Sequence, residues 1–305
     1  MDIASLQAFI AVAKTGSFSS AAEDLFLTQP AVSKRIAGLE DELGARLFDR
    51  IGRRTDLTEA GRALLPRAER VVAELEDSRR AISNLADEVT GRLSIGTSHH
   101  IGLHRLPPIL RAYTRGFPEV ELDLHFMDSE AACQAVERGE LELGIVTLPL
   151  EPAPVLEVVE IWPDPLDVVV GPEHPLAGSA RVPIERLSDY PAILPARGTY
   201  TREVMERAFA PSGVNLRVGM STNYLETIKM LVAVGLGWSI LPRTMLDADL
   251  LALRVPGLQL SRRLGTVRHH ARTLSNAARA LIALLETTAH EPSPRPGKPK
   301  AQNPK

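Results

Sequence analysis

The sequence has few of the residues that form disulfides, membrane spans or secretion signals. Cys133 is the single cysteine, which excludes a disulfide within the chain and predicts a reducing compartment. No apolar run approaches the roughly 18 residues that a membrane span requires, and the N-terminus lacks a signal-peptide pattern. We therefore expect a cytoplasmic protein with no membrane partner. Its 305 residues suffice for more than one domain.

Excess positive charge and catalytic motifs are also missing. The chain carries 35 Lys and Arg against 38 Asp and Glu, and by count residues 1–57 carry seven against eight. Binding to DNA would therefore depend on where charges are placed, and a single copy should bind weakly. The patterns GxxxxGK(S/T), GxSxG and HExxH do not occur, which argues against an enzyme. We expect no cofactor.

Two consecutive short helices are predicted soon after the N-terminus. Ser20 and Glu23 have capping-box spacing and indicate the start of the first helix. Thr28 is a good N-cap for the second helix, and Gly44 is a suitable stop. The second helix carries apolar residues at helical spacing, which predict one buried stripe: Val32, Ile36, Leu39 and Leu43.

The opposite face of the second helix is small, polar and basic in its first half. It carries Pro30, Lys34, Ala37 and Asp41, with Ser33 beside them. Small residues allow a close approach to base edges, and Ser and Lys can contact bases or phosphates. This composition is typical of a helix that reads a DNA groove. An ordinary solvated helix face is the alternative.

A cluster of arginines follows this helix pair. Arg46, Arg50, Arg53 and Arg54 surround Gly52 in the segment RLFDRIGRRTDLT, which predicts a two-stranded turn. Arginines on such a turn can enter the minor groove or bind phosphates. The turn would therefore act as a wing beside the DNA-reading helix.

The segment LQAFIAVAKTGSFSSAAEDLFLTQPAVSKRIAGLEDELGARLFDR, followed by RTDLTEAGRALL, resembles the N-terminal winged helix-turn-helix of the LysR-type transcriptional regulators. The resemblance implies a multidomain fold. It comprises an all-α winged helix-turn-helix head, a long linker helix that forms dimers, and an α/β two-lobed, periplasmic-binding-protein-like effector domain. The resemblance and the wing together give these candidate DNA-binding residues: Ser17, Thr28, Gln29, Pro30, Ser33, Lys34, Arg50, Arg53 and Arg54.

The winged head is assigned to residues 1–57, and residues 58–89 are predicted to form the linker helix. Apolar residues recur four and three apart, interrupted by one serine, as Leu64, Ala68, Val71, Leu75, Ser78, Ile82, Leu85 and Val89. We expect this seam to pair with its copy in a homodimer, and the dimers to assemble into a homotetramer. The alternative is a helix lying across its own effector domain, which is disfavoured because the polar segment EDSRR needs solvent.

Strands and helices alternate after residue 90, which predicts a largely parallel sheet in each of two lobes. The effector domain is assigned to residues 90–290. Lobe I covers about 90–162 and 268–290, and lobe II covers about 163–267. The chain would cross between the lobes near Pro163–Pro165 and near Leu264–Arg268, forming a hinge. Residues 291–305 are Pro-rich and polar, and we expect a disordered tail.

Ligands of such sheets bind beyond the carboxyl ends of the strands, in the cleft between lobes. Helix starts at this edge offer unpaired N–H groups that favour an anion. Candidate effector-binding residues at these positions are Thr97, Ser98, His99, His100, Thr147, Arg197, Thr199, Thr201, Arg202 and Asn223. The hydroxyl groups could instead act only as helix N-caps, and the arginines could pair with Glu203 or Glu206.

We expect no metal site from the adjacent histidine pairs. His99 with His100 and His269 with His270 lack a cysteine or carboxylate at short spacing. Adjacent side chains on an extended segment also point to opposite sides. The sequence analysis therefore assigns no metal ligand.

These features together predict a transcriptional regulator, either an activator or a repressor. An anionic small-molecule effector would bind between the lobes and change how the protein binds promoter DNA at a two-fold site. RNA polymerase is a further candidate partner. The competing interpretation is a ligand-binding α/β protein with an incidental helical head, which need not bind DNA.

Overall fold

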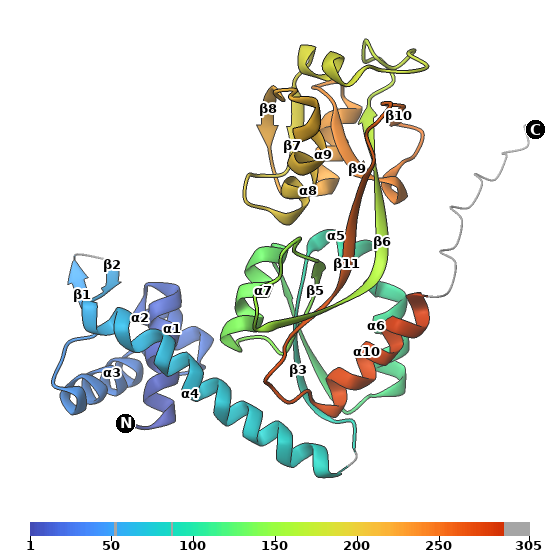
Figure 1. Cartoon of the computed structure of the whole chain (residues 1–305). Helices are drawn as coiled ribbons and strands as arrows, with labels where there is room; N and C mark the ends of the chain where they lie inside the picture. The colour runs from blue at the N-terminus through green and yellow to red at the C-terminus, as the bar shows by residue number, and fades with distance from the viewer. Residues whose placement is uncertain (52–53, 87, 290–305) are drawn as a thin grey trace, which may run out of the picture.

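The computed structural model describes residues 1–51, 54–86 and 88–289. Figure 1 shows a helical head, a long helix α4, and two lobes that are joined by two long strands. The predicted tail, residues 291–305, lies outside the described residues. In the described part of the chain, no helix is both long and apolar enough to cross a membrane.

The head is a three-helix bundle with one hairpin. Its elements are α1 (Ile3–Thr15), α2 (Phe18–Asp24), α3 (Gln29–Leu43), β1 (Phe48–Ile51) and β2 (Arg54–Leu57). The helices pack around an aromatic core in which the Phe9 and Phe48 ring centroids lie 5.4 Å apart. Helix α3 buries Val32, Ile36 and Leu39 as predicted. The expectation that Leu43 is buried is wrong, because α3 ends there and Leu43 is 42% exposed.

Helix α2 begins earlier than the capping-box pattern predicted. Ser17, not Ser20, is its N-cap, and the Ser17 hydroxyl accepts a hydrogen bond from the Ser20 backbone N–H at 3.3 Å. The serine repeat in SFSS offered more than one candidate cap. The short α1–α2 connection selects the first, because Gly16 ends α1 in the left-handed conformation.

Helix α4 (Glu59–Ser83) leaves the head and is followed by the 3₁₀ turn η1 (Asn84–Ala86), so the regular helix ends earlier than predicted. The Thr58 hydroxyl caps it by accepting from the Gly61 N–H at 3.0 Å. A Cβ atom on Gly61 would lie 2.2 Å from the Leu47 carbonyl oxygen. Only glycine therefore lets α4 start so close to the base of the wing.

The first lobe contains α helices on both sides of its part of the sheet. Its elements are β3 (Gly91–Thr97), α5 (His99–His104), α6 (Leu106–Gly116), β4 (Val120–Phe126), α7 (Ser129–Arg138), β5 (Leu143–Thr147), part of β11 (Leu260–His269) and α10 (Asn276–Ala289). Strand β6 (Leu156–Val170) leaves this lobe for the second, and β11 returns to it. Helices α5 and α6 are separated at Arg105.

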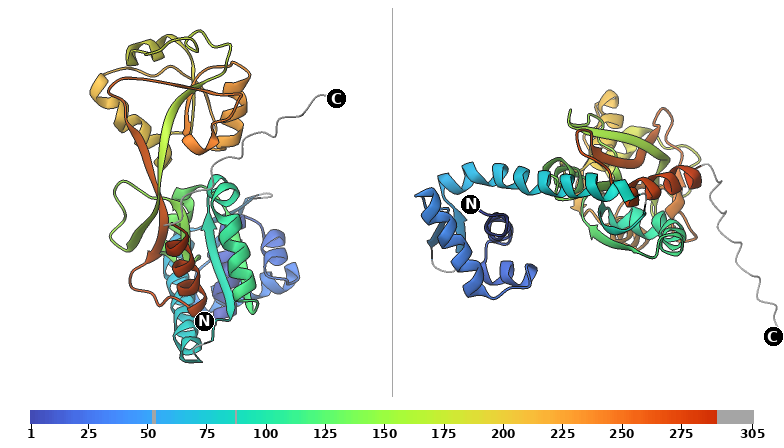
Figure 2. Two further views of the ribbon diagram at one scale, coloured as in Figure 1. Left: turned by 90° about the vertical axis from the view of Figure 1, so that its right-hand side faces the viewer. Right: turned by 90° about the horizontal axis from the view of Figure 1, so that it is seen from below.

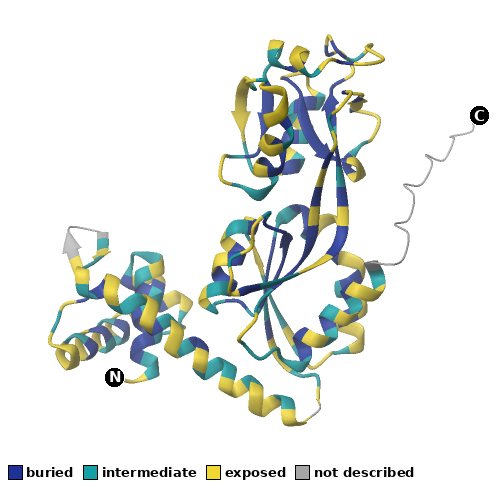
Figure 3. Cartoon of the chain, viewed as in Figure 1, coloured by how far each residue is buried: buried dark blue, intermediate teal, exposed yellow. Residues whose placement is uncertain are grey.

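The second lobe contains shorter elements. They are η2 (Ile184–Asp189), β7 (Ala192–Leu194), α8 (Tyr200–Phe209), η3 (Ala210–Ser212), β8 (Val218–Ser221), α9 (Leu225–Ala233), β9 (Ser239–Pro242), η4 (Arg243–Met245) and β10 (Leu251–Leu253). Each lobe has its own buried core, and Figure 3 shows the buried residues of both lobes in dark blue.

The prediction of largely parallel sheets is wrong. Seven strands form one mixed sheet, in which β3 pairs in parallel with β4 and β5, whereas β11, β9 and β10 make antiparallel pairs. The cause is the ribbon of β6 and β11, which runs out to lobe II and back. Apolar runs in a sequence do not specify strand direction. Strands β7 and β8 form a separate parallel pair.

The crossover between the lobes lies in this ribbon. Pro163, Asp164 and Pro165 are paired with Arg263, Arg262 and Ser261 respectively. The second crossover thus begins before the predicted Leu264–Arg268, and residues 265–268 are already paired with β6 inside lobe I. This shift places Asp164 and Arg262 opposite each other at the hinge.

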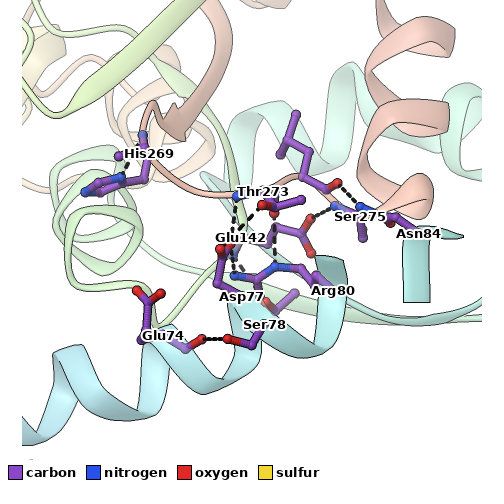
Figure 4. Close-up of polar contacts among 12 residues, drawn as sticks. Glu74, Asp77, Ser78, Arg80, Asn84, Glu142, His269, Thr273 and Ser275 are labelled. Atoms are coloured by element: carbon purple, nitrogen blue, oxygen red, sulfur yellow. Dashed lines mark hydrogen bonds and ion pairs between the residues drawn. The ribbon is translucent and has the colours of Figure 1, made fainter. Parts of the chain in front are cut away.

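A polar joint connects the end of α4 with lobe I (Figures 2 and 4). The Asp77 carboxylate accepts from the Thr273 N–H at 2.6 Å, and Arg80 donates to the Thr273 carbonyl at 3.1 Å. Asn84 donates to the Leu274 carbonyl at 2.8 Å. The expectation that EDSRR needs solvent is therefore wrong for Asp77 and Arg80, because the loop before α10 supplies their partners.

Candidate functional site

The exposed face of α3 forms the candidate DNA-binding surface. Thr28, Gln29, Pro30 and Lys34 are exposed, and Ser33 is half-buried. Thr28 precedes the helix as its N-cap residue, but its hydroxyl makes no capping hydrogen bond. The Thr28 hydroxyl at this helix start is thus positioned to meet a phosphate. Gln29 donates to the Ser33 hydroxyl at 3.0 Å, which orders both side chains.

The start of the wing is held by Glu40 of α3. The Glu40 carboxylate accepts from the backbone N–H groups of Leu47 at 2.7 Å and Phe48 at 3.3 Å. Arg50 pairs with Thr55 in the hairpin, so the wing has the predicted two-stranded form. Arg54 lies on the second strand, whereas Arg53 falls outside the described residues.

Ser17 has a structural role in the head. Its hydroxyl caps α2, and its carbonyl oxygen accepts from the Thr15 hydroxyl at 2.9 Å. A serine that caps a helix can still present its helix start to a phosphate, so the DNA contact of Ser17 stays a prediction.

The second candidate site is a hollow between the two lobes with an empty volume of about 460 Å³ including its open side. It is lined by most of the predicted effector-binding residues: Ser98, His99, His100, Thr147, Thr199, Thr201 and Asn223. The carboxyl ends of β3 and β5 meet helix starts of both lobes at this place. The topological rule for open sheets thus located the cleft correctly.

The hydroxyl groups in the cleft also serve as helix caps. Ser98 Oγ accepts from the Ile101 N–H at 3.4 Å, and Thr199 Oγ1 accepts from the Arg202 N–H at 3.3 Å. Capping and pocket lining are therefore compatible functions for the same residues. The Ser98 hydroxyl proton can still contact a ligand on the open side, whereas the Thr199 hydroxyl donates its proton to the Ala196 carbonyl at 2.9 Å.

Three predicted residues do not line the cleft. Thr97 is fully buried, and its hydroxyl donates to the Ile145 carbonyl on the neighbouring strand β5 at 2.8 Å. Arg202 is buried against Glu206 at 2.8 Å, as the alternative interpretation allowed, and Arg197 is exposed. Both arginines lie along a different surface hollow.

Arg262 is one of several cleft residues that the sequence analysis missed, with Asp128, Ser129, Glu130, Pro195 and Leu225. It is 3% exposed, and its Nε donates to Asp164 Oδ2 at 2.7 Å while Nη1 donates to Thr201 Oγ1 at 3.0 Å. Its Nη2 is buried and has no hydrogen-bond partner among the described residues. The alternation of β11 could have revealed it, because Leu260, Arg262 and Leu264 all face inward.

The Arg262–Asp164 pair belongs to a larger buried charge cluster. Asp164 is fully buried and also lies 3.3 Å from Arg105 Nη2. Two guanidinium groups thus share one carboxylate, and the cluster carries an excess positive charge. Such a cluster attracts an anion in a low-dielectric site.

Contacts between acidic side chains of lobe I and helix starts of lobe II hold the cleft together. Asn223 Nδ2 donates to Asp128 Oδ2 at 2.7 Å, and the Tyr200 N–H donates to the Glu130 carboxylate. Burial raises the pKa of Glu130. Burial also raises the pKa of Cys133 to about 11, so its thiol stays protonated and is not a nucleophile.

The histidines of α5 have different surroundings. The His99 ring lies between Phe126 and Tyr224, with centroids 5.5 Å and 4.9 Å away. Burial and the nearby Arg262 lower the pKa of His100 to about 3, so the ring is neutral. His100, His104 and Glu226 form a group whose potential ligand atoms all lie within 4.8 Å of one another. They could hold a metal ion.

Two family models match the chain. A family model described as "LysR substrate binding domain" matches residues 86–289, and one described as "Bacterial regulatory helix-turn-helix protein, lysR family" matches residues 3–62. An "Uncharacterized HTH-type transcriptional regulator in ibpB-leuC intergenic region" of Azotobacter vinelandii is 71% identical over 35% of this chain and 75% of its own. The regulator YeiE of Escherichia coli is 34% identical over 91% of this chain and 94% of its own.

Solved structures share the architecture. Full-length CbnR complexed with its target DNA is 22% identical with a TM-score of 0.64, covering 95% of this chain and all of that one. The CcmR regulatory domain of Synechocystis PCC6803, solved in complex with 2-PG, is 25% identical with a TM-score of 0.60. It covers 66% of this chain and 98% of that one.

Proposed function

The chain belongs to the LysR family of bacterial transcriptional regulators, and we propose that an anionic small molecule in its cleft controls how paired heads bind promoter DNA. The family consists of DNA-binding regulators and not of enzymes, and its members act as multimers. The proposal covers three points: the chemical class of the effector, the dimer contact and the DNA-contacting residues.

The unpaired Nη2 of Arg262 carries the effector assignment. A buried guanidinium nitrogen without a partner costs free energy, and a carboxylate or phosphate oxygen is its preferred partner. The hydroxyl groups of Ser98 and Thr201 line the same hollow and can donate to the remaining oxygens. The CcmR domain bound to 2-PG supports a small-molecule ligand in this fold.

A thermal-shift panel of carboxylates and phosphate esters on the full chain tests this assignment. A ligand that binds the native state raises its unfolding temperature. We expect at least one anion to stabilise the wild type and to lose this effect in Arg262→Gln. Arg263→Gln is the matched control, because Arg263 donates to the Pro149 carbonyl at 3.2 Å outside this pocket. An anion response that Arg262→Gln retains in full would contradict the proposal.

Two heads are needed because one head lacks excess positive charge. The second half of α4 and the turn η1 expose part of the predicted seam, with Val71 46% and Ile82 70% exposed on α4 and Leu85 83% exposed on η1. Ala68, by contrast, is buried in the head core. We infer that the seam from Val71 onward pairs with the α4 of a second copy in a homodimer, and that dimers assemble into a homotetramer.

The linker helix also offers a route from the cleft to the DNA. The effector would favour one arrangement of the two lobes over another, and α4 is attached to lobe I through Asp77, Arg80 and Asn84. A change between lobes within a multimer would alter the spacing of the heads on a two-fold DNA site. Contact with RNA polymerase and a cytoplasmic location complete the proposal.

A further inference from the structure

A second polar cluster lies beside the anion pocket and involves both lobes. His100 and His104 are four residues apart on α5, so they lie on one face of the helix, with ring centroids 4.8 Å apart. Glu226 approaches them from α9 of lobe II. Its Oε1 lies 2.9 Å from His104 Nε2 and 3.7 Å from His100 Nδ1. Two imidazoles and one carboxylate therefore converge from two lobes.

His100 is the unusual member of this cluster. It is 4% exposed, and neither ring nitrogen has a hydrogen-bond partner among the described residues. Buried polar groups normally have a partner, and each exception requires a physical reason. An imidazole nitrogen that faces another imidazole and a carboxylate has the surroundings of a metal ligand.

We propose that His100, His104 and Glu226 bind a divalent transition metal such as Zn²⁺, and that the metal ties lobe I to lobe II beside the cleft. Imidazole and carboxylate ligands suit this class of ion, and three protein ligands are typical of zinc sites that keep one position open. Because His100 also lines the anion pocket, that position is accessible to water or to an anion.

The nearest positive charges limit the affinity but do not exclude the ion. Arg262 and Arg105 lie close to His100, and both are paired with the buried Asp164 carboxylate. Glu226 is not committed to either arginine and supplies the negative charge of the cluster. We therefore expect weaker binding than at a site built from several cysteine thiolates.

Zinc titration of the chelator-stripped full chain, by calorimetry and by metal analysis after dialysis, tests the site. We expect one Zn²⁺ per chain and no comparable binding of Mg²⁺, which prefers oxygen ligands. His104→Ala and Glu226→Gln should each weaken zinc binding at least about tenfold. His125→Ala is the matched control, because His125 forms an exposed pair with Asp123 on β4 and should leave binding unchanged.

Amide hydrogen exchange tests the link between the lobes. Zinc should slow exchange in α5 and in α9 of the wild type, and it should not slow exchange in α9 of Glu226→Gln. Zinc binding that Glu226→Gln does not weaken would place all ligands in one lobe and overturn the proposed link. Failure of the wild type to bind, or equal binding by His104→Ala, would overturn the site.

Zinc is titrated here without an effector, and Arg262→Gln should retain zinc binding because Arg262 is not one of the ligands. Circular dichroism of each variant identifies any that fail to fold. A wild type that binds zinc, with an anion response that Arg262→Gln retains in full, would therefore contradict the proposed effector site alone.

Discussion

The head and the cleft place their polar groups in opposite ways. The candidate DNA surface consists of exposed side chains from one helix, with Thr28, Gln29 and Lys34 close together in the sequence. The cleft instead gathers buried groups from distant segments, such as Ser98, Asp164 and Arg262. The head can therefore change its contacts at little cost in stability, whereas charges in the cleft are also part of the fold.

Asp164→Ala should have the largest effect. Removing this fully buried carboxylate leaves Arg262 and Arg105 without their shared partner, which costs about 3–5 kcal/mol. Chemical denaturation of the full chain measures the loss. Asp167→Ala is the matched control, because Asp167 pairs with Arg243 on the surface, where a salt bridge contributes about 0–1 kcal/mol. Equal losses in the two variants would contradict the contrast between buried and exposed charge.

Disrupting the α4 seam should have the next largest effect. The double variant Ile82→Glu with Leu85→Glu places charges on the exposed apolar side chains and should convert the multimer to smaller species in sedimentation. Affinity for a two-fold DNA site should then fall at least about tenfold, because the two heads no longer bind together. Ser83→Glu on the same turn serves as the control for added charge. A seam variant that sediments as the wild type would rule out pairing through this part of α4.

Lys34→Ala isolates the head. The exposed Lys34 ammonium has no structural role in α3, so stability should not change, whereas DNA affinity should fall by about 1–3 kcal/mol if it contacts a base. A phosphate contact would instead reduce the salt dependence of binding by about one counterion per head. Mobility shifts at several salt concentrations distinguish the two. Lys14→Ala is the control, because Lys14 pairs with Glu140 on lobe I, 3.1 Å away. Unchanged DNA binding by Lys34→Ala would remove α3 from the interface.

The same contrast determined which features could be predicted from the sequence. In α3, local periodicity and the stop at Gly44 were enough to identify the helix, its buried Val32 and Ile36, and its exposed face. The direction of β11 could not be predicted, because it depends on pairing with β6 about a hundred residues earlier, and an apolar strand carries no sign of direction.

The cleft residues show where local reasoning fails. Arg202 was predicted because it lies near a helix start, but its side chain pairs with Glu206 four residues on. Arg262 lies within a strand, and only the return of β11 beside Asp164 makes it a pocket residue. The proposed metal ligand His104 was not predicted for a related reason. The sequence analysis considered only adjacent histidines, whereas His100 and His104 are spaced i,i+4 on a helix.

The polar joint between α4 and lobe I offers the test with the smallest expected effect, and the most specific one (Figure 4). Glu142 accepts from the Ser275 N–H at 2.6 Å, and burial raises the pKa of its carboxyl group. A raised pKa in the folded state means that the native protein binds the proton more tightly than the unfolded chain. The stabilisation is complete below the unfolded pKa and is lost as the pH rises through the folded value.

Glu142→Gln keeps an oxygen acceptor for Ser275 and removes this dependence of stability on pH. Its unfolding free energy should therefore vary less than that of the wild type above pH about 4.5. The exposed Glu121→Gln should follow the wild type, and a Glu142→Gln curve parallel to the wild type would show that this carboxylate is ionised without cost at the joint.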